Sequence, residues 1–131
     1  MSTRANIIIQ NGEEKLWFYR HSDGYPEGTL PTLEKFLCYV KDGRIRNNVG
    51  QAAGWLVILG AQEYNYDKPW KDEKKAPASD LKFDDYQPGH DIGTDGWKVG
   101  AYEPTAWGQH GDIQYLYTVD LAKLTIEVKE V

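Results

Sequence analysis

The sequence predicts an α+β domain, in which an antiparallel sheet of about five strands carries two helices on one face. A β-hairpin signal opens the chain, two stretches with helical spacing of apolar residues follow, and β-prone runs return in the last third. The expected order of elements is therefore ββααβββ. The 131 residues fit a single domain over 1–131.

The opening hairpin consists of two β-prone runs with a turn signal between them. Ile7-Ile8-Ile9 is the first run, Leu16-Trp17-Phe18-Tyr19 is the second, and Asn11-Gly12 lies between the two. Asn-Gly readily adopts the positive φ angles of a tight turn. Because apolar and polar side chains do not alternate cleanly, we expect both faces of the hairpin to be partly covered.

A first helix is predicted after the Gly- and Pro-containing loop at 20–28. Thr29 is the expected cap, Pro31 suits the first turn, and Gly43 is placed to end the helix. The apolar residues that recur at helical spacing are Leu30, Leu33, Phe36, Leu37 and Val40. Cys38 lies within this pattern and is expected to be a small buried hydrophobe. As the only cysteine it forms no internal disulfide, so no oxidising compartment is implied.

A second helix is predicted to begin near Asn47 or Asn48 and to run toward Tyr64. It is apolar on most sides, which is typical of a heavily buried helix. A buried strand over 55–59 is the alternative, since periodicity does not separate the two in a short apolar run. Gly54 is expected to allow the close approach of a neighbouring element.

The stretch 63–95 is predicted to be an irregular acidic and aromatic excursion from the domain. It contains nine acidic and five basic residues, so it holds most of the net charge of −5. Its five aromatic rings are more than a plain linker needs. The chain then returns to three predicted strands, over 97–102, 112–119 and 124–128, with a turn at 120–123.

Several long segments resemble a group of small proteins encoded by tailed phages and prophages. These are Ser2 to Ile9, Lys15 to Pro26, Asn48 to Leu56, Tyr102 to Thr105 and His110 to Ile113. The resemblance covers most of the chain outside 63–95. No activity is established for the group, so the resemblance supplies no catalytic residue. It implies that the protein acts inside a bacterium during infection or lysogeny, often against host systems.

Two loops carry the candidate ligand-binding residues. The first contains Arg20, His21, Asp23 and Tyr25. A planar guanidinium, an imidazole and a ring together suit an anionic, ring-containing ligand such as a nucleotide. The alternative is a structural turn in which Arg20 pairs with Asp23.

The second loop spans 102–112 and supplies Glu103, Trp107 and His110. If the two loops share one rim of the sheet, their side chains line a single pocket. The alternative is a plain hairpin loop packed by Trp107.

Catalysis and metal binding have weaker support in the sequence. His21 and Asp23, like His110 and Asp112, share a His-x-Asp spacing, which would allow a small, metal-assisted hydrolase. The common His-Glu-x-x-His, paired-cysteine, nucleophile-elbow and phosphate-loop motifs are missing. We therefore expect no metal, no cofactor and no catalytic residue.

Composition narrows the range of partners. The net charge of −5 argues against broad nucleic-acid binding, and the longest apolar stretch is too short for a membrane span. We expect a phage or prophage accessory protein in the host cytoplasm, of the counter-defence or host-takeover type. It would act by non-catalytic binding to a host protein or a small nucleotide-like anion. A structural role in the virion or its assembly is the further alternative, and self-association into a homo-oligomer is left open.

Overall fold

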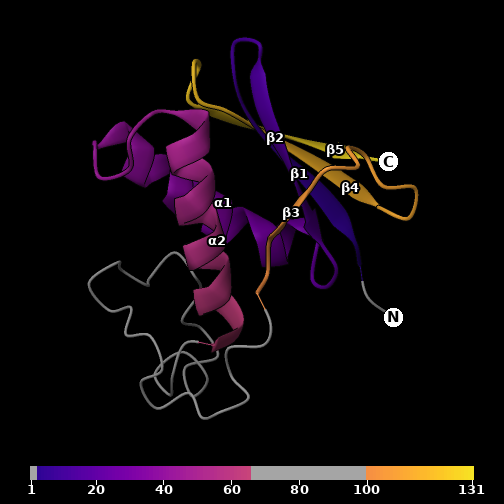
Figure 1. Ribbon diagram of the computed structural model, residues 1–131. Helices are drawn as coiled ribbons and strands as arrows, with labels where there is room; N and C mark the ends of the chain where they lie inside the picture. Colours follow the sequence, from indigo (N-terminus) through magenta and orange to yellow (C-terminus); the bar gives the residue numbers. More distant parts are fainter. Residues whose placement is uncertain (1–2, 66–99) are drawn as a thin grey trace.

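The computed structural model describes residues 3–65 and 100–131. Along the chain these residues form β1 (Ala5–Asn11), β2 (Glu14–Arg20), α1 (Pro26–Lys41), α2 (Val49–Asn65), β3 (Glu103–Thr105), β4 (Tyr115–Asp120) and β5 (Thr125–Glu130). The α+β class and the ββααβββ order are therefore confirmed (Figure 1). Residues 63–65 of the predicted excursion belong to α2, and the remainder of that prediction lies outside the described residues.

The five strands form one sheet in the order β3-β2-β1-β4-β5. The expectation of a purely antiparallel sheet is wrong, because β1 and β4 run parallel while the other neighbouring pairs are antiparallel. A parallel neighbour requires a long crossover connection, and the two helices belong to the connection between β2 and β4. Inward-facing residues of β1, β2 and β4 share one core with both helices.

The central strand β1 is covered on both faces, as the unbroken apolar run predicts. Ala5, Ile7 and Ile9 are fully buried against the helices, and Asn6 and Ile8 on the other face are also buried. In the hairpin, Asn11 pairs with Glu14, so the two loop residues are Gly12 and Glu13. Gly12 has a φ of 64°, which glycine adopts without strain. Asn11 therefore ends the strand instead of forming the turn.

Helix α1 begins earlier than predicted. Pro26 is in its first turn and Tyr25 precedes it as the N-cap residue, without a side-chain capping bond. Thr29 is inside the helix, where its hydroxyl donates to the carbonyl of Asp23 (3.0 Å). The prediction of Thr29 as the cap is therefore wrong. The predicted end is confirmed, because Gly43 follows the C-cap with a φ of 87°.

Helix α2 confirms the helical interpretation of the second apolar stretch and rules out the alternative strand at 55–59. Asn48 caps it, since its Oδ1 accepts a hydrogen bond from the amide of Gln51 (3.0 Å). The glycine that permits close approach is Gly60, which packs against Tyr102, whereas Gly54 is exposed and has open space around it. The expectation for Gly54 is therefore wrong.

The third predicted strand is displaced along the chain. Residues 97–99 lie outside the described part, 100–102 are not in a strand, and β3 occupies 103–105 instead. The two later strands are confirmed with shifted ends, and the Asp120 side chain accepts bonds from the amides of Ala122 and Lys123 in the turn between them. Cys38 is exposed on α1, so the expectation that it is buried is wrong. None of the helices in the described residues is long and apolar enough to cross a bilayer.

Tyr117 ties the sheet to the loop that precedes α1, and this contact makes stability depend on pH. Its hydroxyl donates to the carbonyl of Gly24 (2.6 Å) in the interior, and burial raises its pKa from the ordinary value of 10 to about 12. Above pH 10 the unfolded chain releases this proton while the folded chain keeps it. Stability therefore falls as pH rises from 10 to 12.

We expect Tyr117→Phe to lower the free energy of unfolding at neutral pH by about 1–3 kcal/mol, because the Gly24 carbonyl loses its partner.

Urea unfolding of both proteins at neutral pH and at several values above pH 10 tests this expectation. The difference between wild type and Tyr117→Phe should shrink as the tyrosine ionises in the unfolded chain. A difference that stays constant across this range would show that Tyr117 does not supply the pH dependence.

Candidate functional site

Neighbouring residues of β2 point to opposite faces of the sheet, and this divides the predicted site into two clusters. Phe18 belongs to the core beneath the helices, so by strand alternation Arg20 shares the helix-facing side. Tyr19 points to the opposite face, which we call the outer face. The two predicted loops approach each other on both faces: Tyr102 lies against Arg20 on the helix side, and His110 and Asp112 lie against Tyr19 on the outer face.

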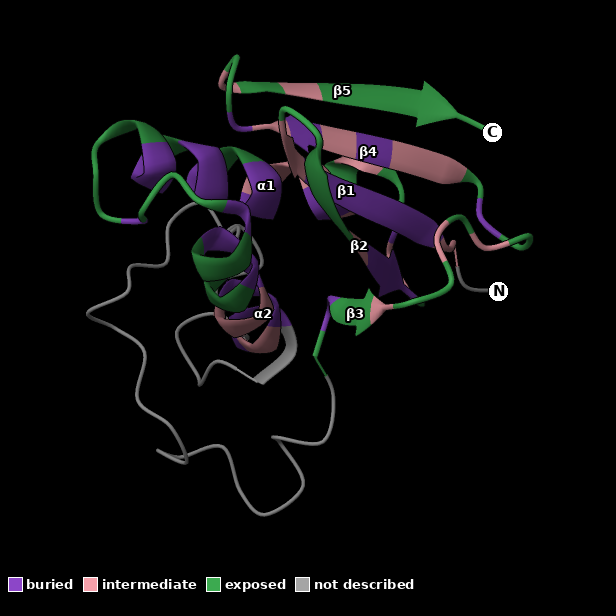
Figure 2. Ribbon diagram, turned by 45° about the horizontal axis from the view of Figure 1, so that its top comes forward, coloured by how far each residue is buried: buried purple, intermediate pink, exposed green. Residues whose placement is uncertain are grey.

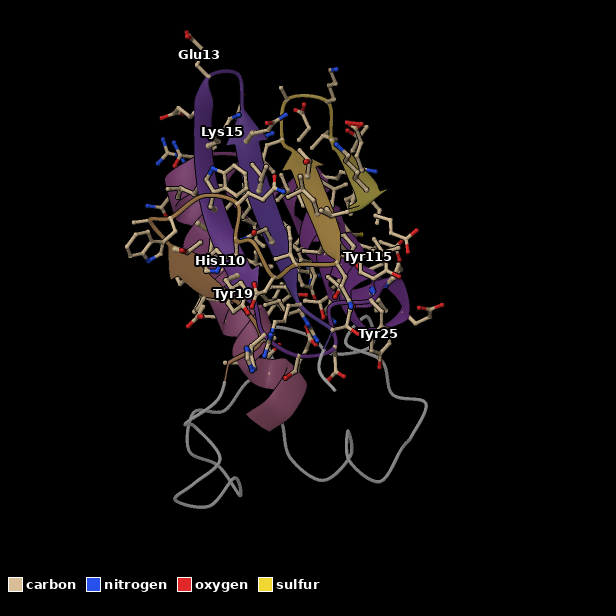
Figure 3. All side chains as sticks on the ribbon, turned by 90° about the vertical axis from the view of Figure 1, so that its right-hand side faces the viewer. Glu13, Lys15, Tyr19, Tyr25, His110 and Tyr115 are labelled. Atoms are coloured by element: carbon tan, nitrogen blue, oxygen red, sulfur yellow. The ribbon has the colours of Figure 1, made fainter. Side chains whose placement is uncertain are left out.

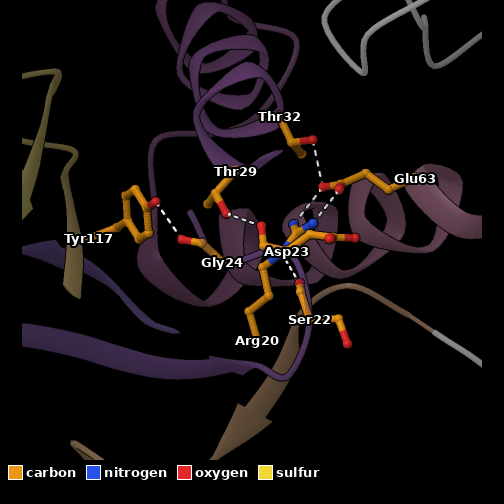
Figure 4. A network of polar contacts seen from close by, with 8 residues as sticks. All are labelled: Arg20, Ser22, Asp23, Gly24, Thr29, Thr32, Glu63 and Tyr117. Carbon is orange, nitrogen blue, oxygen red and sulfur yellow. Dashed lines mark hydrogen bonds and ion pairs between the residues drawn. The ribbon is translucent and has the colours of Figure 1, made fainter. Parts of the chain in front are cut away.

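On the helix side, Arg20 forms a buried ion pair with Glu63 of α2. Its Nη1 and Nη2 atoms donate to the two carboxylate oxygens of Glu63 at 3.0 Å and 2.8 Å (Figure 4). The Arg20 and Glu63 side chains are 1% and 7% exposed. Thr32 of α1 adds a third hydrogen bond to the same carboxylate, at 2.6 Å. This network joins β2, α1 and α2.

Two further contacts hold the Arg20 guanidinium. Its Nε donates to the carbonyl of Ser22 (2.7 Å), and its central carbon lies 5.0 Å from the centre of the Tyr102 ring. Burial raises the pKa of Tyr102 well above its ordinary value, so this ring remains neutral beside the guanidinium. With its donors directed at protein groups and almost no exposed surface, Arg20 has a structural environment, not that of an open anion-binding residue.

The rest of the first loop is also held by internal contacts. Asp23 has a φ of 59°, an unusual value for a residue with a side chain, and its carbonyl accepts the Thr29 bond. The amide of Gly24 donates to the carbonyl of Thr3 (2.8 Å). A Cβ atom on Gly24 would lie 2.9 Å from both that oxygen and the Cβ of Ala5. Tyr25 is 37% exposed at the start of α1. From Ser22 to Gly24 the loop is thus a structural connection, and the exposed rings of His21 and Tyr25 lie on either side of it.

The second loop crosses the outer face of the sheet. β3 pairs with β2, and β4 pairs with β1, so the segment between them must pass over the β1–β2 hairpin. The amide of His110 donates to the Asn6 side chain (2.7 Å), and Gln114 donates to the carbonyl of Arg4 (2.8 Å). The alternative of a plain hairpin loop packed by Trp107 is therefore wrong, because the loop is a crossover and Trp107 is 86% exposed.

Tyr19 is the centre of the outer-face cluster. The His110 ring stacks on it with centroids 4.2 Å apart and an angle of 15° between planes, and the two labelled side chains lie together in Figure 3. The Tyr19 hydroxyl donates to Asp112 Oδ2 (3.1 Å), and the same oxygen pairs with Arg4 Nη1 (3.2 Å). Burial and this hydrogen bond to Asp112 raise the pKa of Tyr19.

The remaining predicted residues surround this stack. His21 is exposed, and its Nδ1 lies 3.4 Å from the Tyr19 hydroxyl. Because that hydroxyl gives its hydrogen to Asp112, a bond to His21 requires the imidazole to be the donor. Glu103 is exposed and sits directly opposite Tyr19 in the β2–β3 register, so it shares the outer face.

Trp107 is the most exposed large apolar residue of the described part, with 86% of its surface accessible. The loop that presents it is fixed on both sides. The Trp107 amide donates to Thr105 Oγ1 (3.2 Å), and that oxygen lies 3.1 Å from Nε2 of His110. The anchored loop therefore presents the indole at the surface, where a partner can reach it.

The structure therefore places His21, Glu103 and His110 around Tyr19, with Trp107 on the same loop as His110. It places Arg20 on the opposite face. Sequence reasoning missed the partners that the fold supplies, chiefly Tyr19, Arg4 and Glu63. Alternation along β2 could have separated Tyr19 from Arg20, but the β3 register that sets Glu103 opposite Tyr19 has no local signal.

The metal-assisted alternative gains no geometric support. Within residues 3–65 and 100–131, no three His, Cys, Asp or Glu side chains lie close enough together to hold a metal ion. This range includes His21, Asp23, His110 and Asp112. The Asp112 carboxylate is instead engaged by Tyr19 and Arg4.

Comparisons with protein-family models, with curated proteins and with solved structures yield no significant match. The candidate site therefore has to be interpreted from its own geometry.

Proposed function

We propose that this protein is a phage- or prophage-encoded accessory protein that acts by non-catalytic binding in the host cytoplasm. The proposed partner is a host protein, in keeping with a counter-defence or host-takeover role. The phage context is supported by the sequence resemblance described above. The choice of a protein partner rests on one observation, the 86% exposure of Trp107 on an anchored loop.

An exposed tryptophan held in place suits recognition of a protein surface. Tryptophan is among the residues that most often dominate binding energy at protein interfaces. Here the loop is fixed through Thr105, Asn6 and His110, so little conformational entropy is lost when the indole is covered. The outer face that this loop crosses also carries polar and ring groups, from Glu103 and His21 beside Tyr19, and these are available to a partner in addition to the indole.

The small-anion alternative has less support in this geometry. It depended on the Arg20 guanidinium as the group that binds the anion. That side chain is 1% exposed and bound bidentately to Glu63. Of the residues around Tyr19, Arg4 is the cation, and it is paired with Asp112. A protein surface is therefore the preferred partner.

We expect Trp107→Ala to abolish capture of the host partner while leaving the fold unchanged. Removing a central aromatic anchor costs at least about 2 kcal/mol of binding, or roughly thirtyfold in affinity. The tagged full chain and the variant would be expressed in a bacterial host, and the co-purified proteins compared by quantitative mass spectrometry. Affinity for the purified candidate would then be measured by calorimetry.

Leu16→Ala is the matched control, because Leu16 is 43% exposed on the helix-facing side of the sheet. It should retain the partner. If Trp107→Ala and wild type capture the same proteins with equal affinity, the proposed contact surface is wrong. A melting-temperature shift with a nucleotide panel that persists in Trp107→Ala would favour the small-anion alternative.

A further inference from the structure

Strand β5 is an edge strand whose hydrogen-bonding groups alternate between β4 and the free side. The amide of Val131 donates to the carbonyl of Gln114 (2.9 Å), which continues the β4–β5 ladder. By alternation, residues 125, 127 and 129 direct their backbone groups toward β4, and residues 126, 128 and 130 direct theirs outward. Figure 2 shows β5 at the border of the sheet with a mostly exposed surface.

We propose that this edge binds a second copy of the chain, antiparallel to the first, around a two-fold axis at Val128. The two sheets then join into one continuous sheet. Val128 of each copy exchanges backbone hydrogen bonds with Val128 of the other, and Ile126 does so with Glu130. This arrangement uses the outward-pointing groups identified above, and it is self-complementary as a two-fold interface requires. It does not depend on the proposed function of the Trp107 surface.

Charge complementarity favours the register centred on Val128 over registers centred on nearby charged residues. With the axis at Val128, Glu127 of one copy lies opposite Lys129 of the other, and this pair occurs twice. Moving the axis to 127, 129 or 130 would oppose identical charges, Glu to Glu or Lys to Lys. Opposite charges directly across a strand pair are favourable and like charges are unfavourable. Charges on an edge strand normally protect against indiscriminate pairing, and here they favour the register centred on Val128 over those centred on 127, 129 or 130.

The helix-facing side of the edge also complements a second copy. A groove of about 530 Å³ lies between α1 and the start of β5, with Leu37, Lys41 and Ile126 in its lining. Its lining also holds Glu34, so it carries one charge of each sign and adds apolar surface, not a net charge, to the edge. Val128, which is 42% exposed, is covered by its equivalent. Apolar burial on this side therefore adds to the charge pairing of Glu127 and Lys129.

Sedimentation of the full chain over a range of concentrations tests the proposal. We expect wild type to be a dimer that dissociates on dilution. Glu127→Lys and Lys129→Glu should each raise the dimer dissociation constant about tenfold or more, because two attractive pairs become repulsive. The double variant Glu127→Lys/Lys129→Glu restores opposite charges and should recover dimerisation.

Val128→Pro provides a second disruption. The Val128 amide points away from β4, so proline removes only the donor to the second copy. This variant should be monomeric, with the circular dichroism spectrum of wild type. If the proline variant fails to fold, recovery of dimerisation by Glu127→Lys/Lys129→Glu still tests the proposed interface. A wild-type protein that is monomeric at all concentrations, or a dimer unaffected by Glu127→Lys, would overturn the proposal.

Discussion

Removing one partner of the Arg20–Glu63 pair is expected to lower the free energy of unfolding by about 3–5 kcal/mol. Arg20→Met keeps much of the side-chain volume but leaves the Glu63 carboxylate buried without its bidentate partner. The Thr32 hydroxyl would still donate to it. Because the pair joins β2 to α2 and, through Thr32, to α1, its loss affects the contact of the sheet with both helices. Urea unfolding followed by circular dichroism measures the change.

Arg4→Met is the control for this experiment, because it breaks an ion pair of the same type at the surface. The Arg4 and Asp112 side chains are 37% and 46% exposed. Exposed pairs contribute about 1 kcal/mol or less, so Arg4→Met should have a small effect. Replacing both buried partners, as in Arg20→Met/Glu63→Leu, should restore part of the stability, since no buried charge then remains. If Arg20→Met and Arg4→Met have equal effects, Arg20 is not structural and its interpretation as a ligand contact returns.

The local elements were predictable because their signals are local. The hairpin turn, the Asn48 cap and the glycine that ends α1 each depend on residues a few positions apart. The start of α1 was misplaced because both Pro26 and Pro31 are compatible with a first turn. The structure uses Pro26, and Thr29 becomes an interior residue bound to Asp23.

The pairing of strands that are distant in sequence was not predictable in the same way. The parallel β1–β4 pair and the crossover of 106–114 follow from where the chain re-enters the sheet, and no short motif specifies this. The grouping of Arg20 with His110 is wrong for a local reason, because alternation along β2 puts Arg20 on the other face. Glu63 was assigned to the excursion, although it is the ionic partner of Arg20.

The second large effect on stability concerns Gly60 of α2, which packs against Tyr102. Gly54 of the same helix serves as its comparison. We expect Gly60→Ala to lower the free energy of unfolding by about 1–3 kcal/mol, because it overpacks a filled site. An added Cβ would lie 2.5 Å from Cδ2 of the Tyr102 ring and 3.1 Å from the Tyr102 amide nitrogen. The ring is 2% exposed, and the amide of Ala101 is bonded to the carbonyl of Gly60 (3.2 Å), so neither side moves easily.

Gly54→Ala is the matched substitution and should act in the opposite direction. No atom lies within 4 Å of a Cβ atom added there. The variant should gain about 0.4–1 kcal/mol, because alanine loses less backbone entropy than glycine in a helix. Urea unfolding of the two variants therefore separates helix propensity, which they share, from the contact with Tyr102, which only Gly60 makes. In a Tyr102→Ala background the contacts with the ring disappear and the 3.1 Å contact with the backbone amide remains, so the cost of Gly60→Ala should fall. A cost that is unchanged in that background would show that the Tyr102 ring does not require the glycine.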